Sequence, residues 1–216
     1  MTNQGREVCG VSGSSAGTAT AAELFERRVL PLYHLADDAS AIATACHAMA
    51  VRFHRGGTLV VFGNGTASTD AQHVVVEFVH PVIMGKRALP AISLTADVAT
   101  VTGIAGTEGF DEIFAHQLRH LASAQDIALG ISHDGECGNV LHGLAAAREL
   151  GMLTIALVGG DGGRIASRHA ADHIVVAHST DPQVIKEVHV TAYHVLWELV
   201  HVFFQHPDLL EPRGVA

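Results

Sequence analysis

The chain has 216 residues, of which 48% are hydrophobic and 16% are charged, a balance typical of globular rather than disordered proteins. Its formal net charge of −9 argues against a nucleic-acid backbone as partner, and no apolar run is long enough to span a bilayer. Cys9, Cys46 and Cys137 are scattered without CxxC spacing, and the N-terminus lacks the charged-then-apolar order of a signal peptide. We therefore expect a reduced, cytoplasmic protein.

The predicted elements begin after residues 1–20, whose Gly, Ser, Thr and Ala content predicts a flexible tail. Apolar positions at helical spacing cover residues 23–54 in two pieces, which are separated at residues 37–40. The short apolar runs that follow predict strands, and the segments between them predict helices. Strands are expected at 59–62, 91–94, 127–132, 153–158 and 173–176, and helices from residue 71 and at 97–104, 110–122, 137–150, 164–170 and 181–204.

Strands and helices alternate along residues 21–210, and no shift in composition marks an internal linker. This order predicts a single α/β domain with a five-stranded parallel sheet, helices on both faces, N-terminal helices and a long C-terminal helix. Ligands bind such sheets at the carboxyl ends of the strands. Because the polar turns after the first, third and fourth strands are expected there, this edge is the candidate site.

The turn after the first strand, residues 63–66, has the sequence Gly-Asn-Gly-Thr. Its glycines allow a ligand to approach the backbone, and the N-terminus of the next helix attracts anions. Ser68, Thr69 and Asp70 are residue types of a helix N-cap, so we expect the helix to begin at Ala71. A glycine turn of this kind also occurs where only geometry requires it, so by itself it is weak evidence for a site.

Histidine and carboxylate side chains on two helices add chemistry to this turn. His73 and Glu77 lie four residues apart and so share one helix face. Such a pair, completed by an imidazole from another element, can serve as a general acid and base or can ligate a divalent metal such as zinc. A single helical histidine is more often a packing residue. The last helix offers Lys186, Glu187, His189 and His194.

Polar residues also follow the second and third strands. Asp97 is either the N-cap of the next helix or a substrate ligand. Residues 132–137 form a strand-to-helix turn whose shape suits an anion.

Four segments in one order carry a resemblance to a known family: GNGTASTDAQHVVVE, LPAISLTAD, GISHDGECGNVLHGLAAARELGMLTIALVGGDGG and IKEVHVTAYHVLWELV. The chain resembles the sugar isomerase (SIS) domain family and is most similar, within it, to the phosphoheptose isomerases. The similarity covers roughly residues 22–205, and several motifs in a fixed order are more specific than any one of them.

The resemblance implies an aldose–ketose isomerase that converts sedoheptulose 7-phosphate to D-glycero-D-manno-heptose 7-phosphate, or acts on a related sugar, through an enediol. It implies Glu77 as the base that moves the carbon-bound proton and His194 as the partner acid/base. It also implies a zinc site matching His73, Glu77, Lys186 and His194, and a homotetramer with active sites at subunit interfaces. The implied substrate-binding residues are Asn64, Gly65, Thr66, Asp97, Ser132, His133, Asp134, Cys137 and Lys186.

The chain departs from the family pattern at several of these positions. Lys186 stands where the zinc-binding members have glutamine, and an ammonium group cannot ligate zinc unless it loses its proton. Zinc through His73, Glu77 and His194 is therefore a candidate cofactor that Lys186 argues against, with His189 as an alternative donor. Other departures are Ala67 for a ligand-binding serine, Val184 for an arginine, and Ser-His-Asp-Gly-Glu-Cys at residues 132–137 for Ser-Thr-Ser-Gly-Asn-Ser.

The altered turn leaves three hypotheses for the function. Asp134 and Glu136 put carboxylates where the family binds phosphate, and like charges at this separation cost on the order of several kcal/mol in a low-dielectric site. Alternatively, both carboxylates stabilise the N-terminus of the next helix. The leading hypothesis is an isomerase for a differently anchored sugar; the others are a non-catalytic SIS module, like the DnaA-binding relatives, and an oligomeric scaffold.

Overall fold

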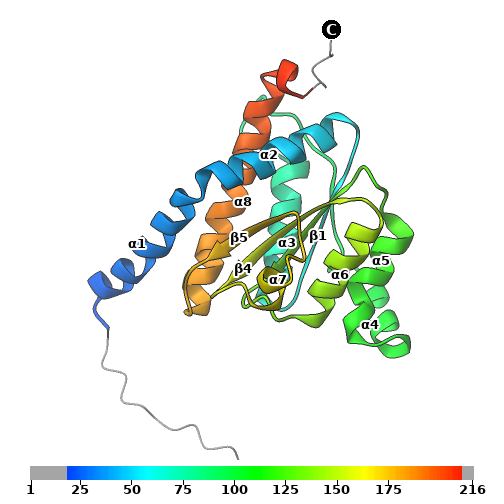
Figure 1. Cartoon of the computed structure of the whole chain (residues 1–216), viewed down its shortest axis with the longest axis horizontal. Coiled ribbons are helices and arrows are strands. Elements are labelled where there is room, and N and C mark those ends of the chain that lie inside the picture. The colour runs from blue at the N-terminus through cyan, green and yellow to red at the C-terminus, as the bar shows by residue number, and fades with distance from the viewer. Residues whose placement is uncertain (1–18, 211–216) are drawn as a thin grey trace, which may run out of the picture.

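The computed structural model describes residues 19–210. Most of the predicted tail, residues 1–18, lies outside the described residues. Five parallel strands form one sheet in the order β2-β1-β3-β4-β5 (Figure 1). Their bounds are β1 Leu59–Gly63, β2 Ala91–Ser93, β3 Ile127–Ser132, β4 Leu153–Gly159 and β5 His173–Ala177. The predicted strands are thus confirmed to within a residue, because runs such as β3 are apolar and fully buried.

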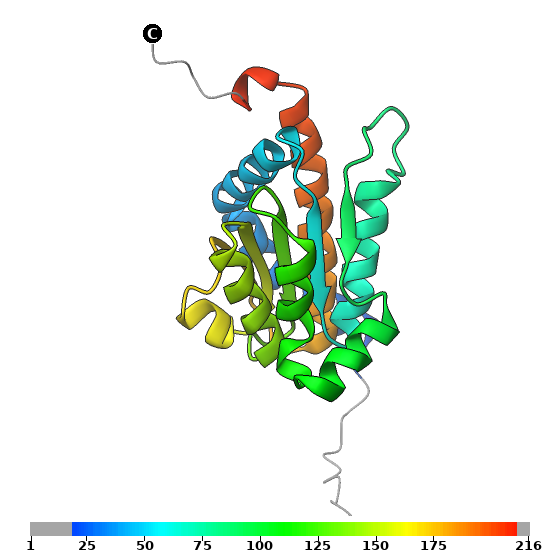
Figure 2. The same cartoon turned by 90° about the vertical axis from the view of Figure 1, so that its right-hand side faces the viewer.

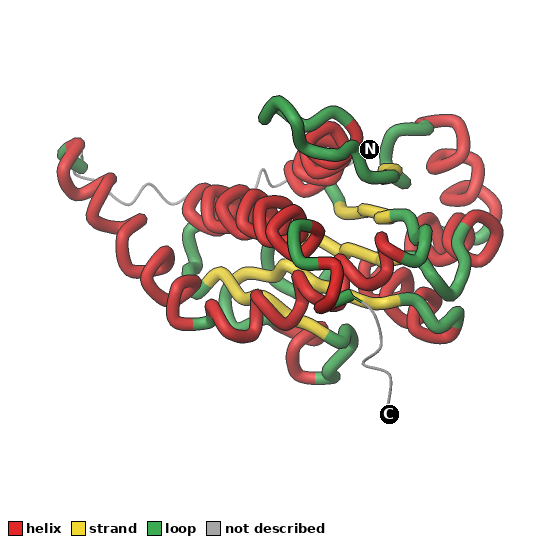
Figure 3. Tube along the Cα trace, turned by 90° about the horizontal axis from the view of Figure 1, so that it is seen from above, coloured by secondary structure: helices red, strands yellow, loops and turns green. Residues whose placement is uncertain are grey.

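The helices cover both faces of the sheet, as predicted (Figure 3). Their bounds are α1 Ala21–Asp37, α2 Ala39–His54, α3 Thr66–Val79, α4 Val98–Thr107, α5 Ile113–Leu121, α6 Gly138–Glu149, α7 Gly163–Ser167 and α8 Pro182–Phe204, with short 3-10 turns at Phe110–Glu112 and Pro207–Leu209. One core lies between the sheet and α2, α3 and α8, and the other lies between the sheet and α4 to α7. Alternate strand residues enter the two cores: Val61 faces the first and Val60 the second.

Helices α3 and α8 contact each other on one face of the sheet, and both run beside β1 in Figure 2. Helix α3 follows β1 directly in the chain, whereas α8 is the last helix, more than a hundred residues later. Their contact therefore brings side chains that are far apart in the sequence close together.

The predicted start of α3 is wrong. The helix begins at Thr66 rather than at Ala71, after Gly65, whose φ of 55° is a conformation that glycine adopts without strain. Ser68 and Thr69 lie in the first turns, where their hydroxyls donate to backbone carbonyls one turn earlier instead of capping the helix. The first turn of α3 consequently lies at the glycine turn itself, where the N–H groups of Ala67 and Ser68 donate to the carbonyls of Asn64 and Gly65.

The N-terminal helices agree with the prediction of two pieces joined near Asp38. Thr20 and Glu23 form a reciprocal capping box at the start of α1, which continues through Pro31. Helix α1 projects beyond the sheet in Figure 1 and carries exposed apolar side chains. Within residues 19–210, no helix combines the length and the apolar character needed to cross a membrane.

Candidate active site

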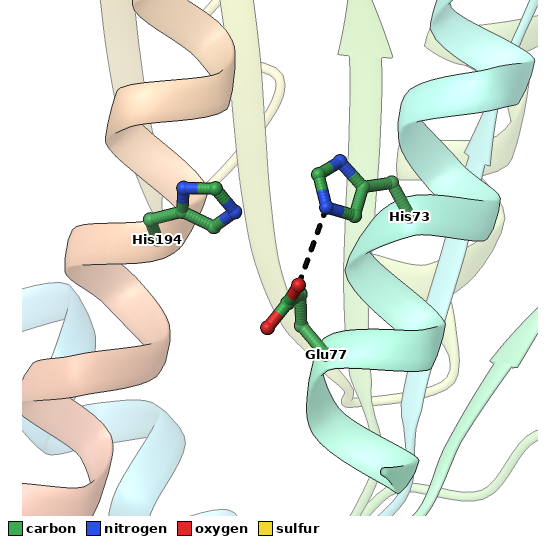
Figure 4. Close-up of side chains that lie close together, drawn as sticks. All are labelled: His73, Glu77 and His194. Carbon is green, nitrogen blue, oxygen red and sulfur yellow. Dashed lines mark hydrogen bonds and ion pairs between the residues drawn. The ribbon is translucent and has the colours of Figure 1, made fainter. Parts of the chain in front are cut away.

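Side chains from α3 and α8 meet in a triad of His73, Glu77 and His194 (Figure 4). His73 Nε2 lies 3.3 Å from Glu77 Oε1, a hydrogen bond between side chains one turn apart on α3. His194 reaches the pair from α8, and its ring lies edge-on to that of His73 with centroids 5.3 Å apart. One ligand atom from each of the three side chains lies within 4.8 Å of the other two. The structure therefore brings together the predicted acid/base pair and the predicted metal ligands.

Tyr193 orients the imidazole of His73. Its hydroxyl oxygen lies 2.7 Å from His73 Nδ1, on the side of the ring opposite Glu77. Burial raises the pKa of Tyr193, and the negative charges of Asp70 and Glu77 raise it further, so the phenol stays protonated at neutral pH. The hydroxyl can then donate to Nδ1 while Nε2–H donates to Glu77. These partners fix the ring in the plane that the triad requires.

Lys186 and Asp70 form an ion pair one turn before the triad on α3. Lys186 Nζ donates to Asp70 Oδ1 at 2.6 Å, and Thr66 O and Thr69 Oγ1 lie 3.3 Å from the same ammonium group. The Asp70 carboxylate is only 4% exposed, so the ammonium is its counter-ion in a nearly buried position. An ammonium held by three acceptors has no lone pair for a metal, so Lys186 in this position is not a metal ligand.

A cavity of about 210 Å³ opens beside this ion pair. Its lining comes from the start of α3, from the β3 turn and from α8, and includes Asp70, His133, Lys186 and His189. His189 is 3% exposed, and its Nε2 has no hydrogen-bond partner. Burial lowers the pKa of His189, although a hydrogen bond with the backbone of Val158 opposes this, so the ring is neutral at pH 7. The cavity wall thus offers a cation and a neutral imidazole.

The β3 turn is closed by its own side chains. Asp134 Oδ1 accepts from Ser132 Oγ at 3.2 Å and from the Glu136 backbone N–H at 3.0 Å, and Ser132 Oγ accepts from Gly135 N–H. The Asp134 carboxylate and the Ser132 hydroxyl therefore each occupy one N–H group that an external anion could otherwise use. His133 Nε2 lies 3.3 Å from Asp134 Oδ2, so an imidazole faces the other carboxylate oxygen.

Glu136 does not add an uncompensated charge to this turn. Its carboxylate accepts from the Arg164 backbone N–H at 2.9 Å and from Arg164 Nε at 2.7 Å. The expected repulsion from a second carboxylate is thus offset by a guanidinium group. Neither Asp134 nor Glu136 caps α6, because the N-cap position belongs to Cys137 and receives no side-chain hydrogen bond. The alternative prediction that both carboxylates cap this helix is wrong.

Asn64 in the glycine turn forms a reciprocal amide pair with Asn139. Asn64 Nδ2 donates to Asn139 Oδ1 at 2.6 Å, and Asn139 Nδ2 donates to Asn64 Oδ1 at 3.0 Å. This pair joins the β1 turn to the start of α6. Asn64 and Gly65 also line a second cavity of about 230 Å³, on the side of α4 and α5.

Comparisons with known proteins show the family of the chain. A family profile described as SIS domain matches residues 25–159. The phosphoheptose isomerase of Pelobacter propionicus is 41% identical over 178 residues, which span 82% of this chain and 88% of that protein. The corresponding protein of Chlorobaculum parvum is 36% identical over 199 residues, which span 89% and 95%. The chain belongs to the phosphoheptose isomerase family of SIS-domain proteins.

Solved structures of this phosphoheptose isomerase family have the same fold. A phosphoheptose isomerase from Francisella tularensis superposes with a TM-score of 0.78 at 33% identity, over 84% of this chain and 96% of that one. A phosphoheptose isomerase from Neisseria gonorrhoeae gives a TM-score of 0.76 at 29% identity, over 83% and 95%. The predicted family and the predicted fold class are both confirmed.

The residues that were predicted to bind the substrate fall into separate groups. Thr66, His133 and Lys186 line the cavity beside the ion pair, and Asn64 and Gly65 line the second cavity. Ser132, Asp134 and Cys137 belong to the β3 turn. Asp97 lies apart from both cavities: its carboxylate accepts from the Ala99 and Thr100 N–H groups as the N-cap of α4.

Sequence reasoning missed three residues that shape the site. Asp70 was assigned to a cap, yet it shares the buried face of α3 with Ala67, Ala71 and Val74, and this helical spacing could have indicated its position. Tyr193 lies in the apolar stripe of α8 and could have been identified in the same way. No sequence pattern indicates a role for Asn139, since its pairing with Asn64 depends on tertiary contacts.

Proposed function

We propose that the chain is an aldose–ketose isomerase that converts sedoheptulose 7-phosphate to D-glycero-D-manno-heptose 7-phosphate, as its relatives' names indicate. The observation that carries the proposal is the meeting of Glu77 and His194, from helices far apart in the chain, in one triad with His73. A carboxylate and an imidazole in one site are the two groups that this proton transfer needs. The proposal includes action in the cytoplasm, as the cysteine pattern predicts.

The assigned roles follow the chemistry of the reaction. Glu77 takes a proton from C1 of the ketose and returns it to C2 of the same sugar, after the enediol has formed. His194 gives a proton to the carbonyl oxygen at C2 and takes one from the hydroxyl at C1, so the protons balance over the cycle. His73 holds the Glu77 carboxylate from one side, and Tyr193 holds His73. Glu77 is half-buried, with 14% of its side chain exposed, which limits the competition of water for its oxygens.

The triad also fits a divalent metal. Its three ligand atoms are two imidazole nitrogens and a carboxylate oxygen, the donor set of many catalytic zinc sites, in which a further position stays open. With a metal on Nε2, His73 takes the other tautomer, in which Nδ1–H donates to the Tyr193 hydroxyl as the second ring N–H of metal-bound histidines typically does. We infer that His73, Glu77 and His194 hold the ion without Lys186. When bound, zinc supplies Lewis-acid polarisation of the sugar carbonyl.

The expected assembly is a homotetramer. Helix α1 projects from the domain with Leu24, Phe25, Leu30 and Tyr33 exposed, and Phe25 is 74% exposed. Apolar side chains gathered on a projecting helix favour contact with another copy of the chain. Light scattering on the purified protein tests this point, and a monomer at micromolar concentration would contradict it.

A turnover assay tests the proposed activity. Purified protein is incubated with sedoheptulose 7-phosphate and, separately, with unphosphorylated sedoheptulose, and the aldose product is measured. We expect turnover of the phosphorylated sugar by the native chain and none by Glu77→Gln. Equal turnover by the two proteins would contradict the role of Glu77. Binding without turnover would favour the non-catalytic module, for which the Asp134 carboxylate in the β3 turn is the supporting observation.

A further inference from the structure

The β3 turn contains a second group of metal-ligating side chains, separate from the triad on α3 and α8. His133, Asp134 and Cys137 each offer one ligand atom, and these atoms lie within 4.8 Å of one another. The three residues come from five consecutive positions at the end of β3 and the start of α6. We propose that this turn binds a transition-metal ion of the zinc class through a nitrogen of His133, an oxygen of Asp134 and the sulfur of Cys137.

The separation of the first two donors fits a single ion. His133 Nε2 and Asp134 Oδ2 are 3.3 Å apart. Two ligands bound to one tetrahedral zinc at about 2.0–2.1 Å are about 3.4 Å from each other. The sulfur of Cys137 lies within 4.8 Å of both donor atoms, and the cysteine is free and half-buried.

The carboxylate is already oriented by its neighbours. Asp134 Oδ1 is held by Ser132 Oγ and by the Glu136 N–H, so Oδ2 is the oxygen that remains for a metal. Support of a ligating carboxylate by hydrogen bonds to its other oxygen is a common feature of protein metal sites. The side chains of His133 and Asp134 are 58% and 44% exposed, which leaves room for an exchangeable fourth ligand.

The donor types select the ion. A thiolate and an imidazole together favour zinc and its neighbours in the transition series, whereas magnesium and calcium prefer oxygen donors. Binding displaces the thiol proton to solvent. One thiolate, one carboxylate and one divalent cation then sum to zero charge, in a turn that otherwise presents the Asp134 carboxylate.

A role for this ion follows if the proposed isomerase function holds. His133 also lines the cavity beside Lys186, so an ion held at the turn lies at the rim of that cavity. Its open position can take an oxygen of an anionic group on the substrate. The ion thereby replaces the hydroxyl groups that this turn lacks, and it neutralises the local negative charge.

Cobalt(II) titration of the full chain, stripped with chelator, tests the site. Cobalt bound to a thiolate gives a near-ultraviolet charge-transfer band, which the triad cannot give because it contains no sulfur. We expect the intensity of this band to reach its maximum once the turn has bound one cobalt ion per chain. We expect no such band in Cys137→Ser. In His133→Asn we expect cobalt affinity to fall about tenfold or more. Circular dichroism verifies that both variants are folded.

Two matched variants exclude other sources of the sulfur band. Cys46→Ala should keep the band, because Cys46 is fully buried and burial raises the pKa of its thiol to about 12. Cys9→Ser should also keep it. No band in the native protein, or a band that persists in Cys137→Ser, would overturn the proposed site.

Inorganic phosphate tests the anion role without any turnover. Added to the cobalt-loaded protein, it should change the visible cobalt spectrum if the open position accepts an anionic oxygen. An unchanged spectrum would overturn the anion role. The same measurement on Glu77→Gln, which lacks the proposed catalytic base, should give the same change, and this separates failure of the metal site from failure of the isomerase proposal.

Discussion

The ion pair between Lys186 and Asp70 yields the prediction with the most direct structural basis. Lys186→Met removes the ammonium group that lies 2.6 Å from the Asp70 carboxylate, while it keeps most of the aliphatic side chain. The carboxylate is 5% exposed and would be left without its counter-ion between α3 and α8. Removing one partner of a buried pair costs about 3–5 kcal/mol. Because the Lys186 side chain is 38% exposed, water can replace part of the interaction, and we expect about 2 kcal/mol.

A double-mutant cycle isolates the interaction itself. Asp70→Asn alone removes the charge from the buried side and leaves Lys186 free to turn toward solvent, so its cost should be smaller, about 1 kcal/mol. The double variant should be less destabilised than the sum of the single variants, with a coupling energy of about 1–2 kcal/mol. Urea unfolding at one fixed protein concentration gives the four free energies of unfolding.

The melting temperature offers a second readout. For a domain of this size, about 2 kcal/mol corresponds to a decrease of about 4–8 °C in Lys186→Met. If the two substitutions add to within about 0.3 kcal/mol, the side chains do not interact in solution, and the explanation for the absence of Lys186 from the metal triad fails.

Three further predictions concern catalysis, pH and backbone geometry. Glu77→Gln should lower kcat at least about 100-fold with unchanged far-ultraviolet circular dichroism, as expected for loss of a general base. Burial lowers the pKa of His189 from its usual 6.5, so the unfolded chain binds more protons below that pH. The free energy of unfolding should therefore fall as pH drops below about 6.5, by up to about 1.4 kcal/mol per pH unit from this residue. His189→Gln should remove that part of the slope in urea unfolding from pH 7.5 to about 5.5, and an identical slope would contradict the assignment. Gly135→Ala would place a Cβ 2.0 Å from the carbonyl oxygen of Gly162, at a φ of +70°. It should cost about 3–5 kcal/mol, whereas Gly160→Ala, at a φ of +68° with open space around it, should cost only about 1–2 kcal/mol. Equal melting temperatures for the two alanine variants would show that the contact between the loops is absent.

The strands could be predicted from the sequence because each buried parallel strand is a short, continuous apolar run. Residues 127–132 illustrate this, since the predicted range and β3 coincide. The start of α3 could not, because Ser68, Thr69 and Asp70 are the preferred N-cap types. The real helix uses Gly65 in a positive-φ conformation. The hydroxyls of Ser68 and Thr69 donate to backbone carbonyls one turn earlier, and Asp70 pairs with Lys186.

Contacts within the site could be predicted where both side chains lie on one helix. They could not be predicted from spacing where the side chains come from two different elements. His73 and Glu77 share a helix, so their proximity follows from a spacing of four residues. The prediction that His194, on another helix, approaches this pair came from the family resemblance. The partner of Glu136 could not be predicted from the sequence, because Arg164 lies on another element, α7, and contacts it only after folding.

The contact of the β3 turn with the loop before α7 has a consequence for how this family diversifies. The turn's path is set by backbone approach between Gly135 and Gly162 and by the Glu136–Arg164 link. Neither constraint depends on the chemical identity of residues 133, 134 or 137. Evolution can therefore exchange hydroxyls for imidazole, carboxylate and thiol there without rebuilding the scaffold, and ligand preference can drift while the catalytic helices stay the same.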